Sequence, residues 1–217
     1  MSVPDLKEAA RKVRLVVTDV DGVHTSDLVT IYGKPDADRK LVFGLHVGGK
    51  AARLMPCDEA GAEVMHYLAS AEDGRIEGYQ FFTGDGIAVK ECRRNGIPVV
   101  MVTGRNSPAI RQRASDLGVE CRTGVSDKVG EVGRIVASLG IAWDETLFIG
   151  NDVQDLALLR LAGFSAAPSD AVQEVRDEVM YVSVKKGGEG AVRDILQRLL
   201  EFKGLWQEIV KRERTLG

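Results

Sequence analysis

Short runs of β-branched and other apolar residues recur along the chain, separated by longer segments with helical spacing. Each run is continuous, without alternation between apolar and polar positions. Continuous runs are typical of parallel strands that are covered by helices on both faces. The pattern therefore predicts an α/β fold with a doubly wound, Rossmann-like parallel sheet. The predicted strands are residues 13–18, 97–102, 146–150, 163–167 and 179–184.

The segments between these strands carry signals of helix ends. Helices are expected over residues 85–96, 107–118 and 126–140, and each of these segments ends on a glycine, which favours a left-handed C-cap. In the second segment, Ser107 is the expected N-cap and Pro108 takes the first helical position. The alternation of strands and helices supports the predicted parallel sheet.

The end of the chain also has helical spacing. Residues 199–217 are expected to form one helix, with residues 211–214, Lys-Arg-Glu-Arg, in solvent. The side chains expected to pack are Leu199, Leu200, Phe202 and Trp206.

The composition is that of an ordinary globular protein. Of the 217 residues, 44% are hydrophobic and 28% are charged, so a single domain over residues 1–217 is expected. With a net charge of −3 and scattered Lys and Arg, the chain has no basic stripe for nucleic acid. No apolar run of about 18 residues indicates a membrane span, and the charged N-terminus is unlike a signal peptide, so a cytoplasmic protein is expected. Cys57, Cys92 and Cys121 are expected to be free thiols.

Polar residues gather directly after the predicted strands and, in the case of Lys128, at the first turn of the third predicted helix. Ligands bind to doubly wound sheets at the carboxyl ends of the strands, where these residues would converge. Carboxylate and amide oxygens suit Mg²⁺, and a hydroxyl and an ammonium group suit a phosphate. The set therefore predicts a site for Mg²⁺ and a phosphate. Its members are Asp19, Asp21, Thr103, Gly104, Arg105, Lys128, Asn151, Asp152 and Asp155.

These residue types suit phosphoryl transfer. Asp19 is expected to attack phosphorus as a nucleophile and form an aspartyl-phosphate. Asp21, two residues later, is expected to protonate the leaving oxygen and then to activate water. Thr103 and Lys128 would position the phosphate and neutralise its charge.

Four sequence motifs, VVTDVDGV, VVMVTGR, SDK and LFIGNDVQDLALL, resemble those of the haloacid dehalogenase (HAD) superfamily in their usual order. DVDGVHT, GDGIAVKECRRNGIPVVMVTGR and GGEGAVRDIL are further similar to the 3-deoxy-D-manno-octulosonate 8-phosphate phosphatase group and its relatives that act on nine-carbon sugar acid phosphates. The resemblance covers residues 13–43 and 79–203. It implies a Mg²⁺-dependent phosphatase with an aspartyl-phosphate intermediate.

The resemblance also assigns roles to single residues. It implies that Asp19 is the nucleophile, that Asp21 is the acid/base whose backbone carbonyl also meets Mg²⁺, and that Thr103 and Lys128 are the phosphate-binding side chains. The family's metal ligand after the glycine of the last motif is here Asn151. Because an amide is uncharged, Asp152 or Asp155 would supply negative charge to the metal, directly or through water. The residues implied to bind substrate or to lie near it are Gly104, Arg105, Asp85, Arg193, Gly187 and Gly188.

The chain departs from this group in two places. Gly84 stands where the group has an arginine before Asp-Gly. Where the group has a short hairpin, this chain carries a surplus over about residues 44–78, so residues 24–83 are expected to form an enlarged, cap-like hairpin insertion. Residues 58–70 are compatible with a helix that has Val64, Tyr67 and Leu68 on one face.

The histidines of this insertion, His46 and His66, are expected to be surface or core residues and not ligands. The resemblance implies a homo-oligomer, a tetramer formed through the hairpin.

Two function hypotheses remain open from the sequence. The first is a phosphatase acting on a small phosphorylated metabolite, a phosphorylated 3-deoxy keto sugar acid. The second is a non-catalytic accessory subunit, such as that of a phenylphosphate carboxylase-type complex. A third class, a receiver-like phosphoacceptor domain, is disfavoured by Asp21, because a domain that stores phosphate does not use a leaving-group acid two residues after its nucleophile.

Overall fold

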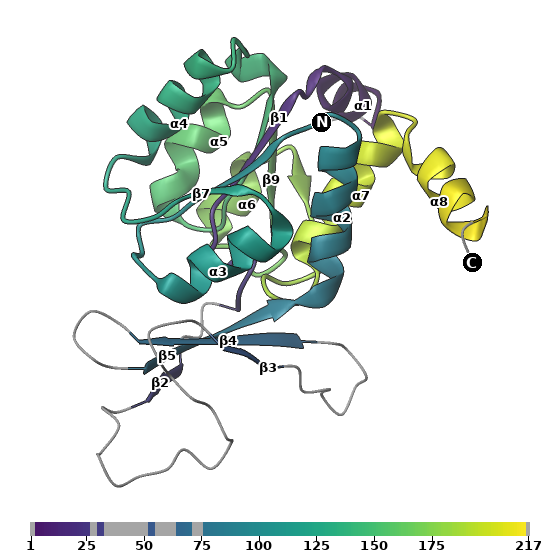
Figure 1. Cartoon of the computed structure of the whole chain (residues 1–217). Coiled ribbons are helices and arrows are strands. Elements are labelled where there is room, and N and C mark those ends of the chain that lie inside the picture. The colour runs from purple at the N-terminus through teal and green to yellow at the C-terminus, as the bar shows by residue number, and fades with distance from the viewer. Residues whose placement is uncertain (1–2, 27–29, 33–51, 55–63, 71–75, 216–217) are drawn as a thin grey trace, which may run out of the picture.

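Figure 1 shows the computed structural model of the chain, which describes residues 3–26, 30–32, 52–54, 64–70 and 76–215. A central parallel sheet has helices on both of its faces, and a separate antiparallel sheet lies beside helices α2 and α3. The doubly wound α/β fold predicted from the sequence is confirmed.

The parallel sheet has six strands in the order β10-β9-β8-β1-β6-β7. The predicted strand runs are confirmed in a shortened form. The predictions omitted β7, a short strand whose residues are all at least partly exposed and which therefore lacks an apolar run. The strands are β1 (Leu15–Thr18), β6 (Val99–Val102), β7 (Glu120–Arg122), β8 (Thr146–Ile149), β9 (Phe164–Ala167) and β10 (Tyr181–Val182).

The helices divide between the two faces of this sheet. Val16 of β1 belongs to the core beneath α1, α2, α3 and α7, whereas Leu15 and Val17 belong to the core beneath α4, α5 and α6. Because both faces are covered, every residue of β1 is apolar or buried, which explains the continuous run. The helices are α1 (Val3–Lys12), α2 (Thr83–Arg94), α3 (Pro108–Leu117), α4 (Lys128–Ser138), α5 (Leu156–Leu161), α6 (Gln173–Glu178), α7 (Ala191–Phe202) and α8 (Trp206–Thr215), with 3₁₀ turns η1 (Trp143–Glu145) and η2 (Val153–Asp155).

The predicted helix ends are confirmed. The Ser107 hydroxyl accepts a hydrogen bond from the Ala109 backbone N–H at 3.3 Å. Gly96, Gly118 and Gly140 each have a positive φ, in the region that glycine adopts readily. Among the described residues, none of the helices combines the length and apolarity needed to cross a membrane.

The second sheet has four antiparallel strands in the order β2-β5-β4-β3: β2 (Thr30–Tyr32), β5 (Ile76–Phe82), β4 (Val64–Ser70) and β3 (Ala52–Leu54). The strand β2 pairs antiparallel with β5, and β3 and β4, which lie between them in the sequence, come from the surplus over residues 44–78. The prediction of a helix over residues 58–70 is wrong for Val64–Ser70, the part that the structure describes, because these residues form the strand β4. All seven residues of β4 pair with β5, and this ladder overrides a helical spacing read from a short segment. His46, Cys57 and residues 58–63 lie outside the described residues.

The C-terminal segment is also corrected. It forms two helices, because Gly204 adopts a φ of +76° between α7 and α8. Leu199 and Leu200 are buried, and Phe202 and Trp206 pack against the core as predicted. Residues 211–214 are not all free in solvent: the Arg212 guanidinium pairs with the buried Glu91 carboxylate of α2 at 2.5 Å.

Candidate active site

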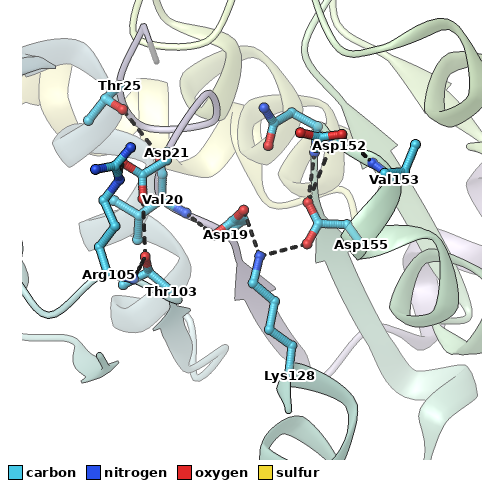
Figure 2. Close-up of polar contacts among 11 residues, drawn as sticks. Asp19, Val20, Asp21, Thr25, Thr103, Arg105, Lys128, Asp152, Val153 and Asp155 are labelled. Carbon is cyan, nitrogen blue, oxygen red and sulfur yellow. Dashed lines mark hydrogen bonds and ion pairs between the residues drawn. The ribbon is translucent and has the colours of Figure 1, made fainter. Parts of the chain in front are cut away.

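Three neighbouring strands of the parallel sheet bring the predicted site residues together. The central strand β1 pairs with β6 on one side and with β8 on the other, so their carboxyl ends lie side by side. A cavity of about 470 Å³ opens at these ends. Most of the predicted set lines it, as Figure 2 shows in part. The lining residues are Asp19, Asp21, Thr103, Gly104, Arg105, Lys128, Asn151, Asp152 and Gln154.

Asp19 follows the last residue of β1 and is only 2% exposed. One carboxylate oxygen accepts the Val20 backbone N–H at 2.8 Å, and the other lies 2.8 Å from the Lys128 ammonium. Burial and the nearby Asp155 charge raise the pKa of Asp19 to about 7, against the opposing effect of Lys128. The side chain is therefore held in one orientation, in surroundings where a further positive charge would favour its ionised form.

Lys128 is the first residue of α4 and bridges two carboxylates, with its ammonium 2.8 Å from both Asp19 and Asp155 (Figure 2). Burial alone would lower the pKa of Lys128, but these two charges outweigh it and raise the pKa. The lysine is thus a buried, doubly paired cation at the wall of the cavity.

Asp155 is fully buried and is not among the cavity-lining residues. Its second oxygen accepts the backbone N–H groups of Asn151 at 3.1 Å and Asp152 at 3.4 Å. A Cβ at Gly150 would lie 2.6 Å from the Cβ of Asp155, so this close approach requires glycine. Asp155 therefore shapes the loop that presents Asn151 and Asp152, and it holds Lys128 in place.

Both oxygens of Asp21 contact side chains from the segment after β6. The Arg105 Nε lies 2.9 Å from Oδ1, and the Thr103 hydroxyl donates to Oδ2 at 3.1 Å. The Thr103 hydroxyl in turn accepts the Arg105 backbone N–H at 3.0 Å. Asp21, Thr103 and Arg105 therefore form one polar network at the cavity.

Two residues predicted to bind substrate, Asp85 and Arg193, are not among the residues that line this cavity, and their role toward the substrate stays a prediction. Asp85 is buried in the first turn of α2, where it accepts the Arg193 backbone N–H at 2.8 Å and so caps α7. Burial raises the pKa of Asp85 to about 7. The Arg193 guanidinium lies over the Trp206 ring, 5.0 Å from its centroid. These two residues join α2, α7 and α8.

The predicted glycine-rich segment packs against the loop that carries Asp21. The Gly188 N–H donates to the Val23 carbonyl at 3.2 Å, and an added Cβ at Gly187 would collide with the Gly22 carbonyl. Gly188 also has a φ of +71°, which favours glycine. The segment therefore supports the loop through close backbone contact.

Sequence reasoning missed Gln154 and the buried pair of Thr18 and His24. Gln154 lies in η2 beside Asp152 and lines the cavity, but an isolated glutamine carries no motif signal. The Thr18 hydroxyl and the His24 Nε2 are 2.9 Å apart on either side of the Asp19–Asp21 turn. Burial, with a smaller contribution from Arg113, lowers the pKa of His24 to about 3. The only sequence signal for this contact is that Thr18 and His24 lie on either side of Asp19 and Asp21 in the same short segment.

The donor set of the cavity fits a hard divalent cation. Asp19, Asp21 and Asp152 offer carboxylate oxygens and Asn151 offers an amide oxygen, and no imidazole or thiol appears among its described lining residues. In the described part of the chain, no three Asp, Glu, His or Cys side chains are grouped so that they could hold a metal on their own. A cation here would therefore use the Asn151 amide together with the carboxylates.

Comparisons with known proteins agree with this fold. The 3-deoxy-D-manno-octulosonate 8-phosphate phosphatase of Haemophilus influenzae is 30% identical over 141 residues, which span 64% of this chain and 76% of that protein. The cobalt-bound structure of the Haemophilus influenzae phosphatase superposes with a TM-score of 0.67 at 25% identity, covering 91% of this chain and 93% of that one.

A crystal structure of the phosphatase of the same name from Moraxella catarrhalis, in complex with magnesium, phosphate and KDO, has a TM-score of 0.72 at 22% identity and covers 97% of this chain and 99% of that one. No family model matches the chain.

The doubly wound sheet, its acidic strand-end cavity and these relatives define a phosphatase of the HAD superfamily, an enzyme that hydrolyses phosphoric monoesters. Within that superfamily, the chain belongs to the family of the 3-deoxy-D-manno-octulosonate 8-phosphate phosphatases.

Proposed function

We propose that this protein is a Mg²⁺-dependent phosphatase that hydrolyses a phosphorylated 3-deoxy keto sugar acid through an aspartyl-phosphate intermediate. One observation carries the proposal: Asp19 and Asp21, at the end of the central strand, share a cavity with Thr103 and Lys128. Two carboxylates, a hydroxyl and a buried ammonium meet the needs of phosphoryl transfer, which are a nucleophile, an acid and charge neutralisation.

Asp19 is the proposed nucleophile. Its carboxylate oxygen attacks phosphorus to form an aspartyl-phosphate, while the ester P–O bond breaks and its electron pair leaves on the substrate oxygen. Asp21 donates a proton to that oxygen. In the second step, the Asp21 carboxylate takes a proton from water as the water oxygen attacks phosphorus. The bond between phosphorus and Asp19 then breaks, which releases phosphate and restores the carboxylate.

Lys128 and Thr103 position the phosphoryl group in this proposal. The Lys128 ammonium, 2.8 Å from Asp19, would neutralise phosphoryl oxygens beside the nucleophile. Asp155 fixes the lysine from behind the cavity. The Thr103 hydroxyl would donate to a phosphoryl oxygen.

The Asp19 carboxylate, the Asp21 backbone carbonyl and the Asn151 amide are the proposed Mg²⁺ ligands, which leaves the Asp21 carboxylate free for proton transfer. Asp152 adds negative charge to the same cavity. When bound, the cation would neutralise the carboxylates and polarise the phosphoryl group. The magnesium of the Moraxella catarrhalis structure and the cobalt of the Haemophilus influenzae structure support a divalent cation as the cofactor.

The proposed substrate class rests on Arg105 and on the relatives. The Arg105 guanidinium borders the cavity beside Asp21 and suits the carboxylate of a sugar acid. The name of the Haemophilus influenzae relative and the KDO in the Moraxella catarrhalis structure support the same class.

Three further features belong to this proposal. Residues 24–83, which include the antiparallel sheet, would act as a cap-like insertion within a single domain. We expect a cytoplasmic homo-oligomer, a tetramer by resemblance. Light scattering would measure the mass of this oligomer.

The test is phosphate release by the purified chain with and without Mg²⁺. The substrates are phenyl phosphate and a panel of sugar phosphates that includes 3-deoxy-D-manno-octulosonate 8-phosphate. We expect turnover that requires Mg²⁺ and is fastest with a sugar acid phosphate. A folded protein without turnover on any compound would instead favour the accessory-subunit hypothesis.

A further inference from the structure

Asp21, the proposed acid/base, is held by the two side chains that are proposed to bind the substrate. We propose that an anionic substrate releases Asp21 by exchange: its phosphate takes Thr103, and a second anionic group takes Arg105. The inference rests on the proposed function and adds to it a coupling between substrate recognition and the proton-transfer group. In this coupling Arg105 determines specificity by acting on Asp21 as well as on the substrate.

The Thr103 contact makes the first half of the exchange necessary. A hydroxyl has one proton, and the Thr103 hydroxyl donates it to Asp21 at 3.1 Å while accepting the Arg105 backbone N–H at 3.0 Å. Thr103 can therefore donate to a phosphoryl oxygen only when it stops donating to Asp21. Phosphate binding frees one of the two Asp21 oxygens.

After phosphate has bound to Thr103, the second carboxylate oxygen of Asp21 is still paired with Arg105. The guanidinium Nε is 2.9 Å from Asp21 Oδ1, and 51% of the Arg105 side chain is exposed against 19% of Asp21. An ion pair with an exposed partner is weak, and a carboxylate that can engage the guanidinium with two oxygens competes well for it. A phosphate ester without a second anion offers no such competitor, so Asp21 stays paired.

The surrounding backbone indicates that the exchange is a movement of side chains. The N–H groups of Val23, His24 and Thr25 all donate to the Val20 carbonyl, at 3.2, 2.9 and 3.3 Å. Gly188 donates to the same loop. These hydrogen bonds within the loop fix the backbone that carries Asp21. The half-exposed Arg105 side chain is therefore the part that can move.

The test compares two substrates, 6-phosphogluconate and sorbitol 6-phosphate. They differ only at one end, where the first has a carboxylate and the second a hydroxymethyl group. Phenyl phosphate is the third substrate. The proteins are the wild type, Arg105→Ala and Arg105→Lys. The control is Arg160→Ala, which removes an exposed arginine from a pair with Glu178 that does not line the cavity. All assays contain Mg²⁺, and kcat and KM are measured separately.

We expect the wild type to prefer the carboxylate compound. Arg105→Ala should lower kcat/KM for 6-phosphogluconate on the order of 10- to 100-fold and raise kcat severalfold for sorbitol 6-phosphate and phenyl phosphate, because Asp21 is released. Arg105→Lys, which keeps the charge but loses the planar fork, should fall between the two proteins. Arg160→Ala should match the wild type.

The exchange is overturned if kcat for sorbitol 6-phosphate and phenyl phosphate, which lack a carboxylate, is unchanged or lower in Arg105→Ala, since an arginine that only binds substrate predicts that result. If neither sugar phosphate is accepted, kcat for phenyl phosphate decides the question in the same way. A folded wild type that hydrolyses none of the three compounds removes the proposed function itself and the exchange with it.

Discussion

Two buried aspartates, Asp19 and Asp85, differ in what lies opposite their carboxylates. Burial is the largest cause that raises the pKa of each to about 7. Asp19 borders the cavity with the Lys128 ammonium 2.8 Å away, whereas Asp85 is enclosed between α2 and α7 and accepts a backbone N–H. A raised pKa by itself does not mark an active-site acid. Charged groups act on both carboxylates, since Arg113 and Arg193 oppose the raised pKa of Asp85 as Lys128 opposes that of Asp19. In this chain, the adjoining cavity distinguishes the two sites.

The largest effect is expected at the cavity. Asp19→Asn keeps the shape of the side chain but removes the nucleophilic oxygen, so phosphatase activity should fall by about 10⁴-fold or more. The fold should persist because Lys128 keeps its pair with Asp155. Phosphate release and the melting temperature are measured together, with Asp177→Asn as a control at an exposed aspartate. Full activity in Asp19→Asn would contradict the nucleophile assignment.

Lys128→Met should affect both activity and stability. The substitution leaves Asp19 and Asp155 buried near each other without their shared cation, which is expected to cost about 3–5 kcal/mol of unfolding free energy. Loss of the phosphate-neutralising charge should lower kcat by about 10²–10³-fold. Urea unfolding and steady-state kinetics test this, with Lys211→Met as a control on the exposed face of α8. Equal stability of the two variants would show that the ion pair is not structural.

The strand-end residues could be predicted because parallel strands bring their carboxyl ends to one edge of a sheet. Asp19, Thr103 and Asn151 each follow an apolar run by one or two residues, so their meeting requires only the fold class. The part played by Asp155 could not be predicted. It depends on the close approach of its side chain to Gly150 and on hydrogen bonds to Asn151 and Asp152, which no spacing rule describes.

The helix predicted over residues 58–70 failed because strand pairing, and not the local spacing of apolar residues, decides the structure of this segment. All seven residues of Val64–Ser70 pair with β5. Asp85 and Arg193 belong to motifs that resemble those of the family, but a motif does not state which way a side chain faces. Here the Asp85 carboxylate accepts the Arg193 backbone N–H, and the role of both residues toward the substrate stays a prediction.

A smaller effect is expected at Asp85, and it depends on pH. Burial raises the pKa of Asp85 in the folded protein to about 7, whereas in the unfolded chain its pKa returns to the ordinary value of 3.8. This group therefore lowers folding stability as the pH rises between these values. Asp85→Asn cannot ionise, so its melting temperature relative to the wild type should increase by several degrees from pH 4 to pH 7.

Asp170→Asn is the matched control for Asp85→Asn, because Asp170 also accepts a backbone N–H, that of Gly187 at 2.9 Å, but is exposed. Its melting temperature relative to the wild type should not change over the same range. Activity at pH 7 should stay within about twofold in both variants, since neither aspartate lines the cavity. A large loss of kcat in Asp85→Asn alone would show that Asp85 takes part in catalysis or substrate binding.

The smallest effect is expected at Arg193. Its guanidinium lies 5.0 Å from the centroid of the Trp206 ring, a contact worth about 0.5–2 kcal/mol. Arg193→Met should lower the melting temperature by a few degrees and change the fluorescence emission of Trp206, while kcat/KM for a sugar acid phosphate stays the same. The opposite result would be an unchanged melting temperature with a kcat/KM lowered tenfold. It would mean that Arg193 contacts the substrate and that the packing site of Asp85 and Arg193 is part of the active site.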